Sequence, residues 1–245
     1  MIDAYFQGVT TLLKTIQTYE KDAIQKAGEK IAESISNQGI VHLFGCGHSH
    51  LVAADAYYRA GGLVPIQPIF IEELMLHQDA IQSSHIEKKN GYAEKFMRKV
   101  DVRPEDVVIV ISTSGRNPVP IDVAQIALEK GAYVIAVTSL QYRNQFSSKH
   151  EHGFYLSDVA NIVINNHVPI GDTLLSHPMS EVPFGPVSTI ISMTIVHGMI
   201  VTAIEQLIKD GTIPPVFLSG NIEHTTEYNE RLISSYQSRI KFSKR

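Results

Sequence analysis

Hydroxyl side chains stand beside glycines at two places in the sequence, and this pairing can bind an anion. Glycine lets the backbone approach a ligand closely, the start of a following helix offers unpaired N–H groups, and hydroxyls add further donors. The same residues could serve only as helix caps, since Ser and Thr are common there. The repetition favours a phosphate held without a metal. The residues expected to bind it are Gly45, Gly47, His48, Ser49, Ser112, Thr113, Ser114 and Asn117.

Short apolar runs precede both places and predict the elements that position them. These runs are rich in β-branched residues, have no alternation of apolar and polar residues, and are separated by helical patterns. Such a pattern is typical of a parallel sheet covered on both faces. In such a sheet, ligands bind beyond the carboxyl ends of the strands, where both hydroxyl-rich loops fall. The expected strands are 40–44, 64–71, 107–111, 133–137 and 161–164, and the expected helices between them are 50–61, 72–80, 92–99, 118–130 and 142–148.

The rest of the chain predicts extra helices at both ends of a single domain. Residues 1–38 have apolar positions spaced by three and four, so they are expected to be helices that pack on a core formed by residues 39–212. Residues 213–245 form a tail with a polar helix at about 226–240. The polar stretch 77–90 is the best candidate for a long functional loop.

A stretch without charged residues, 182–204, is long enough to cross a bilayer. It contains several Ser and Thr residues, together with His197 and Gly198, and no basic cluster flanks it. These features favour a buried core helix, expected at 186–209, over a membrane span. No interaction with a membrane is therefore predicted.

The composition of the 245 residues is that of an ordinary globular protein. Hydrophobic residues make up 44% and charged residues 19%, which excludes the collagen, coiled-coil and disordered classes. The net charge of −4 argues against a nucleic-acid partner bound through phosphate neutralisation. Cys46 is the single cysteine, so no internal disulfide can form, and the first 20 residues lack a signal-peptide pattern. A cytoplasmic location is expected.

No motif for a nucleotide cofactor or a metal stands at the first hydroxyl-rich loop. The dinucleotide fingerprint requires a glycine three residues after Gly47, where His50 stands, and no Gly-Lys-Ser/Thr sequence follows. His48 and His50 lack an evident third ligand, so a zinc site is not predicted. We therefore expect neither a cofactor nor a metal.

On these residues the chain resembles the sugar isomerase (SIS) domain family. The family's first phosphate loop, G-x-G-x-S, is matched by Gly45, Gly47 and Ser49. Its second, S-x-S-G-x-[TSN], is matched by Ser112, Ser114, Gly115 and Asn117. The resemblance spans about residues 35–210 and implies a three-layer α/β fold with a five-stranded parallel sheet in flavodoxin-like order. It also implies a phosphorylated sugar as ligand, and a homodimer or homotetramer with sites near the subunit interfaces.

Aldose–ketose isomerisation requires a carboxylate that moves a proton between C1 and C2 of the sugar. Phosphoheptose isomerases carry Glu-Glu-Leu on the helix after the first loop, but this chain has Arg59 at the equivalent position. The candidate bases are instead Glu181, Glu73 and Glu72, although Glu72 and Glu73 could be structural acids at a helix start. Ser188 follows Glu181 by seven residues and is expected to cap a helix or to contact the sugar.

The sequence leaves the reaction and the ring-opening group open. Residues 112–115 are similar to phosphoheptose isomerases, whereas residues 114–118 are similar to N-acetylmuramic acid 6-phosphate etherases. An isomerase is the first expectation, and the alternatives are an etherase that releases lactate or a phosphosugar sensor without turnover. The segment 219–221 could close over the site. The histidines that could open the ring are His48, His77, His85, His167 and His177.

Overall fold

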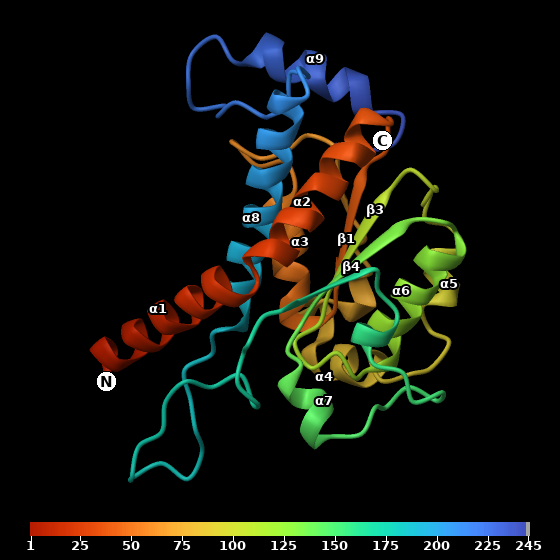
Figure 1. The fold of residues 1–245 in the computed structure, drawn as a ribbon. Helices are drawn as coiled ribbons and strands as arrows, with labels where there is room; N and C mark the ends of the chain where they lie inside the picture. The colour runs from red at the N-terminus through yellow and green to blue at the C-terminus, as the bar shows by residue number, and fades with distance from the viewer. Residues whose placement is uncertain (244–245) are drawn as a thin grey trace.

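A five-stranded parallel sheet with the order β2-β1-β3-β4-β5 lies at the centre of the computed structural model, which describes residues 1–243 (Figure 1). This is the flavodoxin-like order, so the expected fold class is confirmed. Every neighbouring pair of strands is parallel. The strands are β1 (Val41–Gly45), β2 (Ile66–Pro68), β3 (Val107–Ile111), β4 (Tyr133–Thr138) and β5 (Ile162–Asn165).

Two apolar clusters cover the two faces of this sheet, because strand residues alternate between faces. On one face, Val41 and Ile109 lie in the same cluster as Met199. On the other, Phe44 and Val110 lie in the same cluster as Val123. The first face is covered by α2 (Lys21–Ser36), α3 (His50–Ala56) and α8 (Ser188–Lys209). The second is covered chiefly by α5 (Glu94–Met97) and α6 (Pro118–Glu129), with α4 (Leu76–Ile86) and α7 (Gln141–Gln145) nearby.

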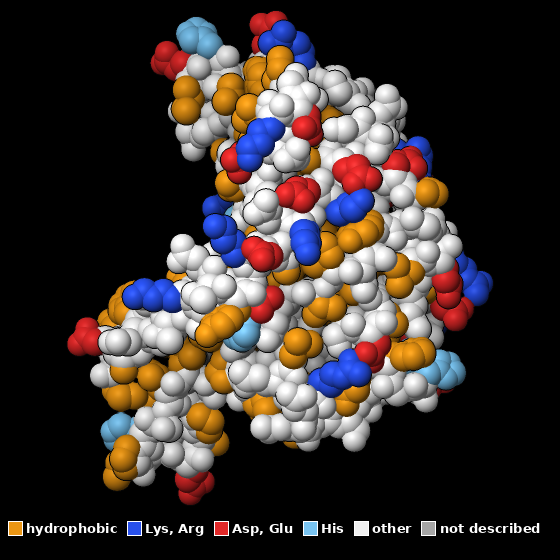
Figure 2. Space-filling view, in the orientation of Figure 1, with side chains coloured by type: hydrophobic (Ala, Val, Ile, Leu, Met, Phe, Trp, Pro, Cys, Tyr) orange, Lys and Arg blue, Asp and Glu red, His pale blue; other side chains and the backbone are white. Residues whose placement is uncertain are grey.

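Helix α1 (Ile2–Tyr19) projects from the body together with the loop 172–187 (Figure 1). The Tyr5 hydroxyl donates to the Pro186 carbonyl oxygen at 2.7 Å and ties the two segments together. Figure 2 shows hydrophobic side chains on this projection, where Phe6, Met179 and Val182 are exposed. The projection therefore presents apolar surface outside the domain core.

Helix α8 is long and apolar enough to cross a membrane by length and composition. In this fold it packs against α2 and α3, and residues such as Ile195 and Met199 on its inner face are buried. Its outer face includes the exposed side chains of Val201 and Ile208. The expected core helix is thus present, but it is buried on one side only.

The segment around 64–90 differs from the prediction. The expected strand 64–71 is reduced to Ile66–Pro68, although the Ile69 N–H still donates to the Leu43 carbonyl oxygen at 2.8 Å. The expected helix 72–80 is instead a single 3₁₀ turn, Glu72–Leu74, followed by α4. The expected loop 77–90 is also wrong, since most of it is α4, kinked at Asp79. This helix buries only Ser83 and Ile86, so its sequence carries little apolar periodicity.

Several helix ends also differ from the expected bounds. Helix α3 stops at Ala56 rather than 61, because Tyr57 is extended and Tyr58 has a positive φ of 51°. Helix α5 has four residues in place of the expected 92–99. Helix α9 (Thr226–Tyr236) ends four residues before the predicted end. These ends depend on local backbone geometry that apolar periodicity does not encode.

Candidate functional site

The first hydroxyl-rich loop is a tight turn between β1 and α3. After Gly45 the chain passes through Cys46 into a 3₁₀ turn, Gly47–Ser49. A Cβ on Gly45 would lie 2.6 Å from the carbonyl group of Ser49, so no larger residue fits. Gly47 has a φ of +55°, a left-handed conformation that favours glycine. Both glycines are therefore required by the turn that presents Ser49 at the sheet edge.

The second loop, between β3 and α6, is fixed by the neighbouring strand β4. The Gly115 N–H donates to Ser112 Oγ at 3.3 Å, and the Ser139 N–H donates to the Thr113 carbonyl at 2.9 Å. Gly115 has a φ of +58°, and a Cβ there would overlap Thr138 Oγ1. These contacts hold the loop rigidly without using the Ser114 hydroxyl.

Two hydroxyls at this edge are free to bind a ligand. The Oγ atoms of Ser49 and Ser114 make no hydrogen bond to any residue within 1–243, and both side chains are partly exposed. The Ser112 hydroxyl accepts a backbone bond, and the Thr113 hydroxyl lies 3.5 Å from the Asn166 amide nitrogen that donates to it. His48 is exposed in the same turn as Ser49. The hydroxyls of Ser112 and Thr113 thus take part in bonds within the protein, whereas those of Ser49 and Ser114 remain available to a ligand.

The start of α6 adds few donors to the site. Pro118 and Pro120 have no N–H group, and the Val119 N–H donates to the Glu87 carbonyl oxygen at 3.2 Å. The positive end of this helix therefore acts through its dipole rather than through its first amides. Any anion here would depend on the loop's own amide and hydroxyl groups.

A half-buried carboxylate, Glu87, lies beside the second loop and was missed by the sequence analysis. Its Oε1 accepts a 2.9 Å hydrogen bond from Asn117 Nδ2, and Asn117 Oδ1 is buried without a partner among residues 1–243. Burial raises the pKa of Glu87, although the Asn117 bond opposes the shift. Burial, with a smaller contribution from the Glu87 charge, also raises the pKa of Cys46, so this cysteine stays a thiol.

Basic side chains flank Glu87 and the second loop. The Arg116 guanidinium donates to the Ser147 carbonyl at 2.9 Å, and the Lys149 N–H donates to the Arg116 carbonyl at 2.9 Å. Burial and the positive charges of Arg116 and Lys88 lower the pKa of Lys149. Burial is the largest cause of this shift, and an anionic ligand among these cations would offset the smaller effect of their charges.

The structure does not bring the three predicted bases together around the loops. Glu72 and Glu73 are exposed in the 3₁₀ turn before α4, and α4 packs against the 47–49 turn. Glu181 is exposed in a loop closed by paired backbone bonds between Leu175 and Phe184, at 2.9 and 2.8 Å. None of the three carboxylates makes a hydrogen bond or ion pair within residues 1–243.

Ser188 does not cap α8, contrary to expectation. It is the first residue of the helix, and its hydroxyl donates to Asp172 Oδ2 at 2.7 Å. Asp172 Oδ1 accepts the N–H groups of Val187 and Ser188 at 3.0 and 2.8 Å, so Asp172 is the group that caps the helix. A cap contributed from sixteen residues away leaves no local sequence signal.

Several of the histidines are held by carboxylates. His42 is buried in β1, as expected, and bonds Asp106. His167 lies 2.8 Å from Glu20, and His197 lies 2.7 Å from Asp55. The His197 side chain, within the helix expected to be a core helix, is 34% exposed. Among the described residues, no group of three His, Cys, Asp or Glu side chains could hold a metal ion.

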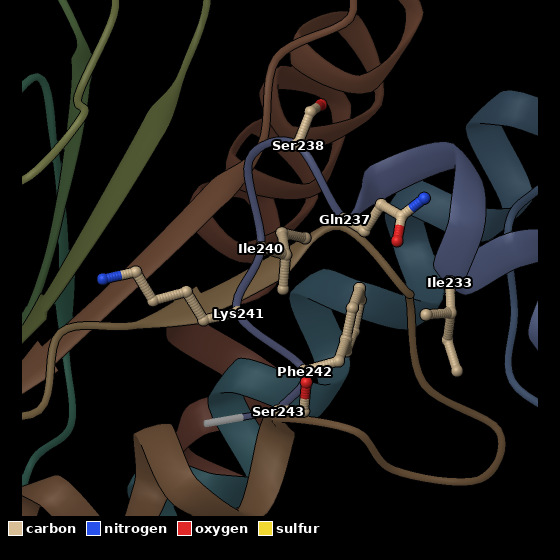
Figure 3. A pocket seen from close by; sticks show the side chains of 7 residues that line it. All are labelled: Ile233, Gln237, Ser238, Ile240, Lys241, Phe242 and Ser243. Carbon is tan, nitrogen blue, oxygen red and sulfur yellow. The ribbon is translucent and has the colours of Figure 1, made fainter. Parts of the chain in front are cut away.

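A large cavity lies away from this edge. It has a volume of about 1010 Å³ and is lined by residues of the C-terminal segment between Ile233 and Ser243 (Figure 3). Figure 1 places α9 at the end of the molecule opposite α4 and α7. The segment 219–221 just before α9 therefore does not close over the hydroxyl-rich loops of its own chain.

With this geometry in place, the fold and the two loops define the class of the protein. A family model described as SIS domain matches residues 4–139, and the chain belongs to the SIS domain family. SIS domains bind phosphosugars. Among curated relatives, UPF0309 protein GK1441 of Geobacillus kaustophilus is 50% identical over 240 residues, which cover 98% of this chain and 96% of the relative. A Lysinibacillus sphaericus protein, named UPF0309 protein in nagA 3'region, is 42% identical and covers 99% of both chains.

Solved structures share the fold at low sequence identity. Phosphoheptose isomerase GmhA from Neisseria gonorrhoeae is 18% identical with a TM-score of 0.53, and the match covers 83% of this chain and 97% of the isomerase. The Vibrio vulnificus NanR protein complexed with ManNAc-6P is 14% identical with a TM-score of 0.52, and the match covers 96% of this chain and 69% of NanR. At such identities the likeness concerns the fold alone.

Proposed function

We propose that this chain binds a phosphorylated sugar at the carboxyl edge of its sheet. The observation that carries the proposal is the pair of unbonded hydroxyls, Ser49 and Ser114, on two rigid glycine loops beside a cluster of cations. The phosphate lies between the loops, with Ser112 and Thr113 as further contacts. A phosphate at this place neutralises the repulsion between Arg116 and Lys149.

Around this phosphate, the remaining predicted residues take secondary positions. Gly45 and Gly47 bring the backbone close to the ligand, and His48 lies beside Ser49 on the exposed side of the turn. Asn117 Nδ2 is already engaged by Glu87, so Asn117 contacts the ligand only after its amide turns. The Ser188 hydroxyl is likewise engaged, by Asp172. These two contacts are the weakest part of the predicted set.

The reaction we propose first is aldose–ketose isomerisation by a carboxylate base. Glu87 is favoured for this role by its place beside the second loop and by its raised pKa, because an acid–base group works best with a pKa near the working pH. Glu72 and Glu73 remain candidates from the turn before α4. Glu181 stands on the projecting loop, so it would act in the site of a second copy, within the proposed cytoplasmic homodimer or homotetramer.

A second candidate is a phosphosugar sensor without turnover. It is favoured by the exposure of Glu72, Glu73 and Glu181, none of which bonds a histidine that could share proton transfer. The NanR complex with ManNAc-6P supports an amino-sugar phosphate as one ligand to test.

The binding proposal is tested by calorimetric titration of the Ser112→Ala/Ser114→Ala protein with ManNAc-6P, a heptose phosphate, N-acetylmuramic acid 6-phosphate and the parent sugars. Hydrogen bonds to a charged phosphate contribute about 1.5–3 kcal/mol each, so the double variant should lose affinity at least about tenfold. Ser176→Ala, at an exposed serine on the projecting loop, is the matched control. Equal affinity for phosphorylated and parent sugars, or an unchanged double variant, contradicts the proposal.

Turnover assays on the ligands that bind then separate the candidates. An isomerase interconverts aldose and ketose and loses turnover in one of Glu87→Gln, Glu181→Gln or Glu73→Gln, with binding retained. Release of lactate from N-acetylmuramic acid 6-phosphate identifies an etherase instead. Binding without product from any of these sugars identifies a sensor.

A further inference from the structure

A second cavity, with a mostly apolar lining, lies away from the hydroxyl-rich loops, beside the edge strand β2. It has a volume of about 380 Å³ and is enclosed by β2, the segment 99–101 after α5, and the chain at 239–241. Its polar lining includes His42, Gln67, Lys99, Asp101, Arg239 and Lys241. Tyr57, Ile69 and Phe70 contribute apolar and aromatic walls. Ser49, Ser112 and Ser114 do not line it, so it is separate from the proposed phosphosugar site.

A buried carboxylate holds two of these lining residues in place. Asp106 lies just before β3, and its Oδ2 bonds His42 Nε2 at 3.2 Å and Arg239 Nη2 at 2.6 Å. The His42 side chain is 2% exposed and the Arg239 side chain 9% exposed. Lining side chains fixed in this way are preorganised, because they lose little freedom when a ligand binds.

The same two side chains retain unused polar atoms. His42 Nδ1, Arg239 Nε and Arg239 Nη1 are buried without a hydrogen-bond partner among residues 1–243. The other carboxylates close to Arg239 are Asp101, 3.2 Å from Nε, and Glu105, 3.8 Å from Nη1, and neither is aligned as a hydrogen bond. These nitrogens are closed to solvent, so they lie behind the cavity wall and are not themselves offered to a ligand.

Two lysines at the same cavity have no carboxylate partner. Lys99 and Lys241 form no ion pair within 4.0 Å among residues 1–243. The Lys241 N–H donates to Gln67 Oε1 at 2.9 Å, which fixes the backbone beside β2. Figure 3 shows the Lys241 side chain directed toward the strands, away from Ile233 and Gln237. Among the residues that line the cavity, the three cations Lys99, Arg239 and Lys241 stand against one carboxylate, that of Asp101.

We propose that this cavity binds a small organic anion, with a carboxylate or phosphate group at Arg239, Lys99 and Lys241 and an apolar or aromatic body against Tyr57, Ile69 and Phe70. The oxyanion accepts hydrogen bonds from the ammonium groups of Lys99 and Lys241 and neutralises their unpaired charges. The apolar walls discriminate against a bare inorganic ion. The site does not depend on the function of the carboxyl edge.

The test is calorimetric titration of the full chain carrying Ser112→Ala/Ser114→Ala, which weakens phosphate binding at the other edge. Phenyl phosphate, benzoate and uncharged benzyl alcohol are the probes. We expect one saturable site for phenyl phosphate, benzoate or both, which names the anion class, and at least about tenfold weaker binding of benzyl alcohol, equal to about 1.4 kcal/mol.

Charge reversal at the cavity is the decisive variant. Lys99→Glu/Lys241→Glu should weaken binding of the anionic probe at least tenfold. Lys14→Glu/Lys26→Glu makes the same change in net charge on the exposed surfaces of α1 and α2 and should leave binding unchanged. Thermal melting of both variants checks the fold. The proposal is overturned if neither anion binds, if benzyl alcohol binds as well, or if the two double variants behave alike.

Discussion

The two ends of β3 carry polar groups of opposite kinds. Asp106 precedes the strand, is fully buried, and receives bonds from His42, Arg239 and the backbone. The hydroxyl-rich loop follows the strand, and Ser114 within it is bonded to nothing among residues 1–243. The difference shows how this fold divides its polar residues. Groups whose bonds are completed inside the chain stabilise the fold, whereas groups held in a rigid loop but left unbonded are available to a ligand.

The largest expected effect on stability comes from a substitution at Asp106, at the end of β3 where the polar groups bond one another within the chain. Asp106→Asn removes the charge that pairs with buried Arg239, and breaking a buried pair costs about 3–5 kcal/mol of the free energy of unfolding. Urea denaturation of both proteins measures the loss. Asp101→Asn is the control, because Asp101 is more than half exposed and its pairs with Arg103 and Arg239 should contribute about 0.2–1 kcal/mol. Similar losses in the two variants would remove the distinction between the ends of β3.

The next effect tests whether the hydroxyl-rich end is held rigidly. Gly115→Ala forces a side chain onto a φ of +58° and against Thr138 Oγ1, so it should destabilise the fold by about 2–3 kcal/mol. It should also weaken binding of a phosphosugar by displacing Ser114.

A matched glycine separates backbone strain from crowding in that experiment. Gly153 has a φ of +74°, and a Cβ added there would meet no atom within 4 Å, so Gly153→Ala carries only the backbone strain, about 1–2 kcal/mol. A Gly115→Ala protein as stable as the Gly153→Ala protein would show that the loop rearranges to fit the added methyl group. The loop would then not hold the hydroxyls in fixed positions.

The architecture of both ends could be predicted from the sequence, because buried β-branched runs carry a strong signal. The predicted strand 107–111 has the bounds that β3 has in the structure. The two glycine loops fall at strand ends for the same reason. Helix α4 was wrongly predicted as a loop, since an exposed helix with few buried positions has little apolar periodicity.

The side-chain partners could not be predicted, because they join positions far apart in the chain. Arg239 meets Asp106 across 133 positions, and Asn117 meets Glu87 across 30. Only the tertiary fold brings such residues together. The asparagine at position 117 was the one available hint, since an amide can donate to a carboxylate as well as to a phosphate.

A smaller effect follows from the pKa of Asp106. Burial alone would raise it, but hydrogen bonds from His42, Arg239 and two backbone N–H groups outweigh burial and lower the pKa to about 2. The unfolded value is about 3.9, so the stabilisation is complete above that pH and is lost as the pH falls toward 2. The loss should amount to about 2 kcal/mol, by linkage at 1.36 kcal/mol for each pKa unit.

Denaturation of the wild-type and Asp106→Asn proteins between pH 6 and pH 2.5 checks this assignment. The difference in unfolding free energy between the two proteins should narrow as the pH falls through 4, because only the wild type loses the charged carboxylate. A difference that stays constant across this range would mean that the Asp106 charge is not what holds His42 and Arg239.

The smallest expected effect on stability is at the hydroxyl-rich end, and it is the sharpest test of the comparison. Ser114 Oγ bonds nothing within residues 1–243, so Ser114→Ala should change the free energy of unfolding by no more than about 0.5 kcal/mol. The same substitution should weaken phosphosugar binding, since a lost bond to a charged group costs about 1.5–3 kcal/mol. Ser112→Ala should cost more stability, because its hydroxyl accepts the Gly115 N–H. If Ser114→Ala instead destabilises the fold and leaves binding intact, Ser114 belongs with Asp106 among the structural residues, and the division between the two ends of β3 fails.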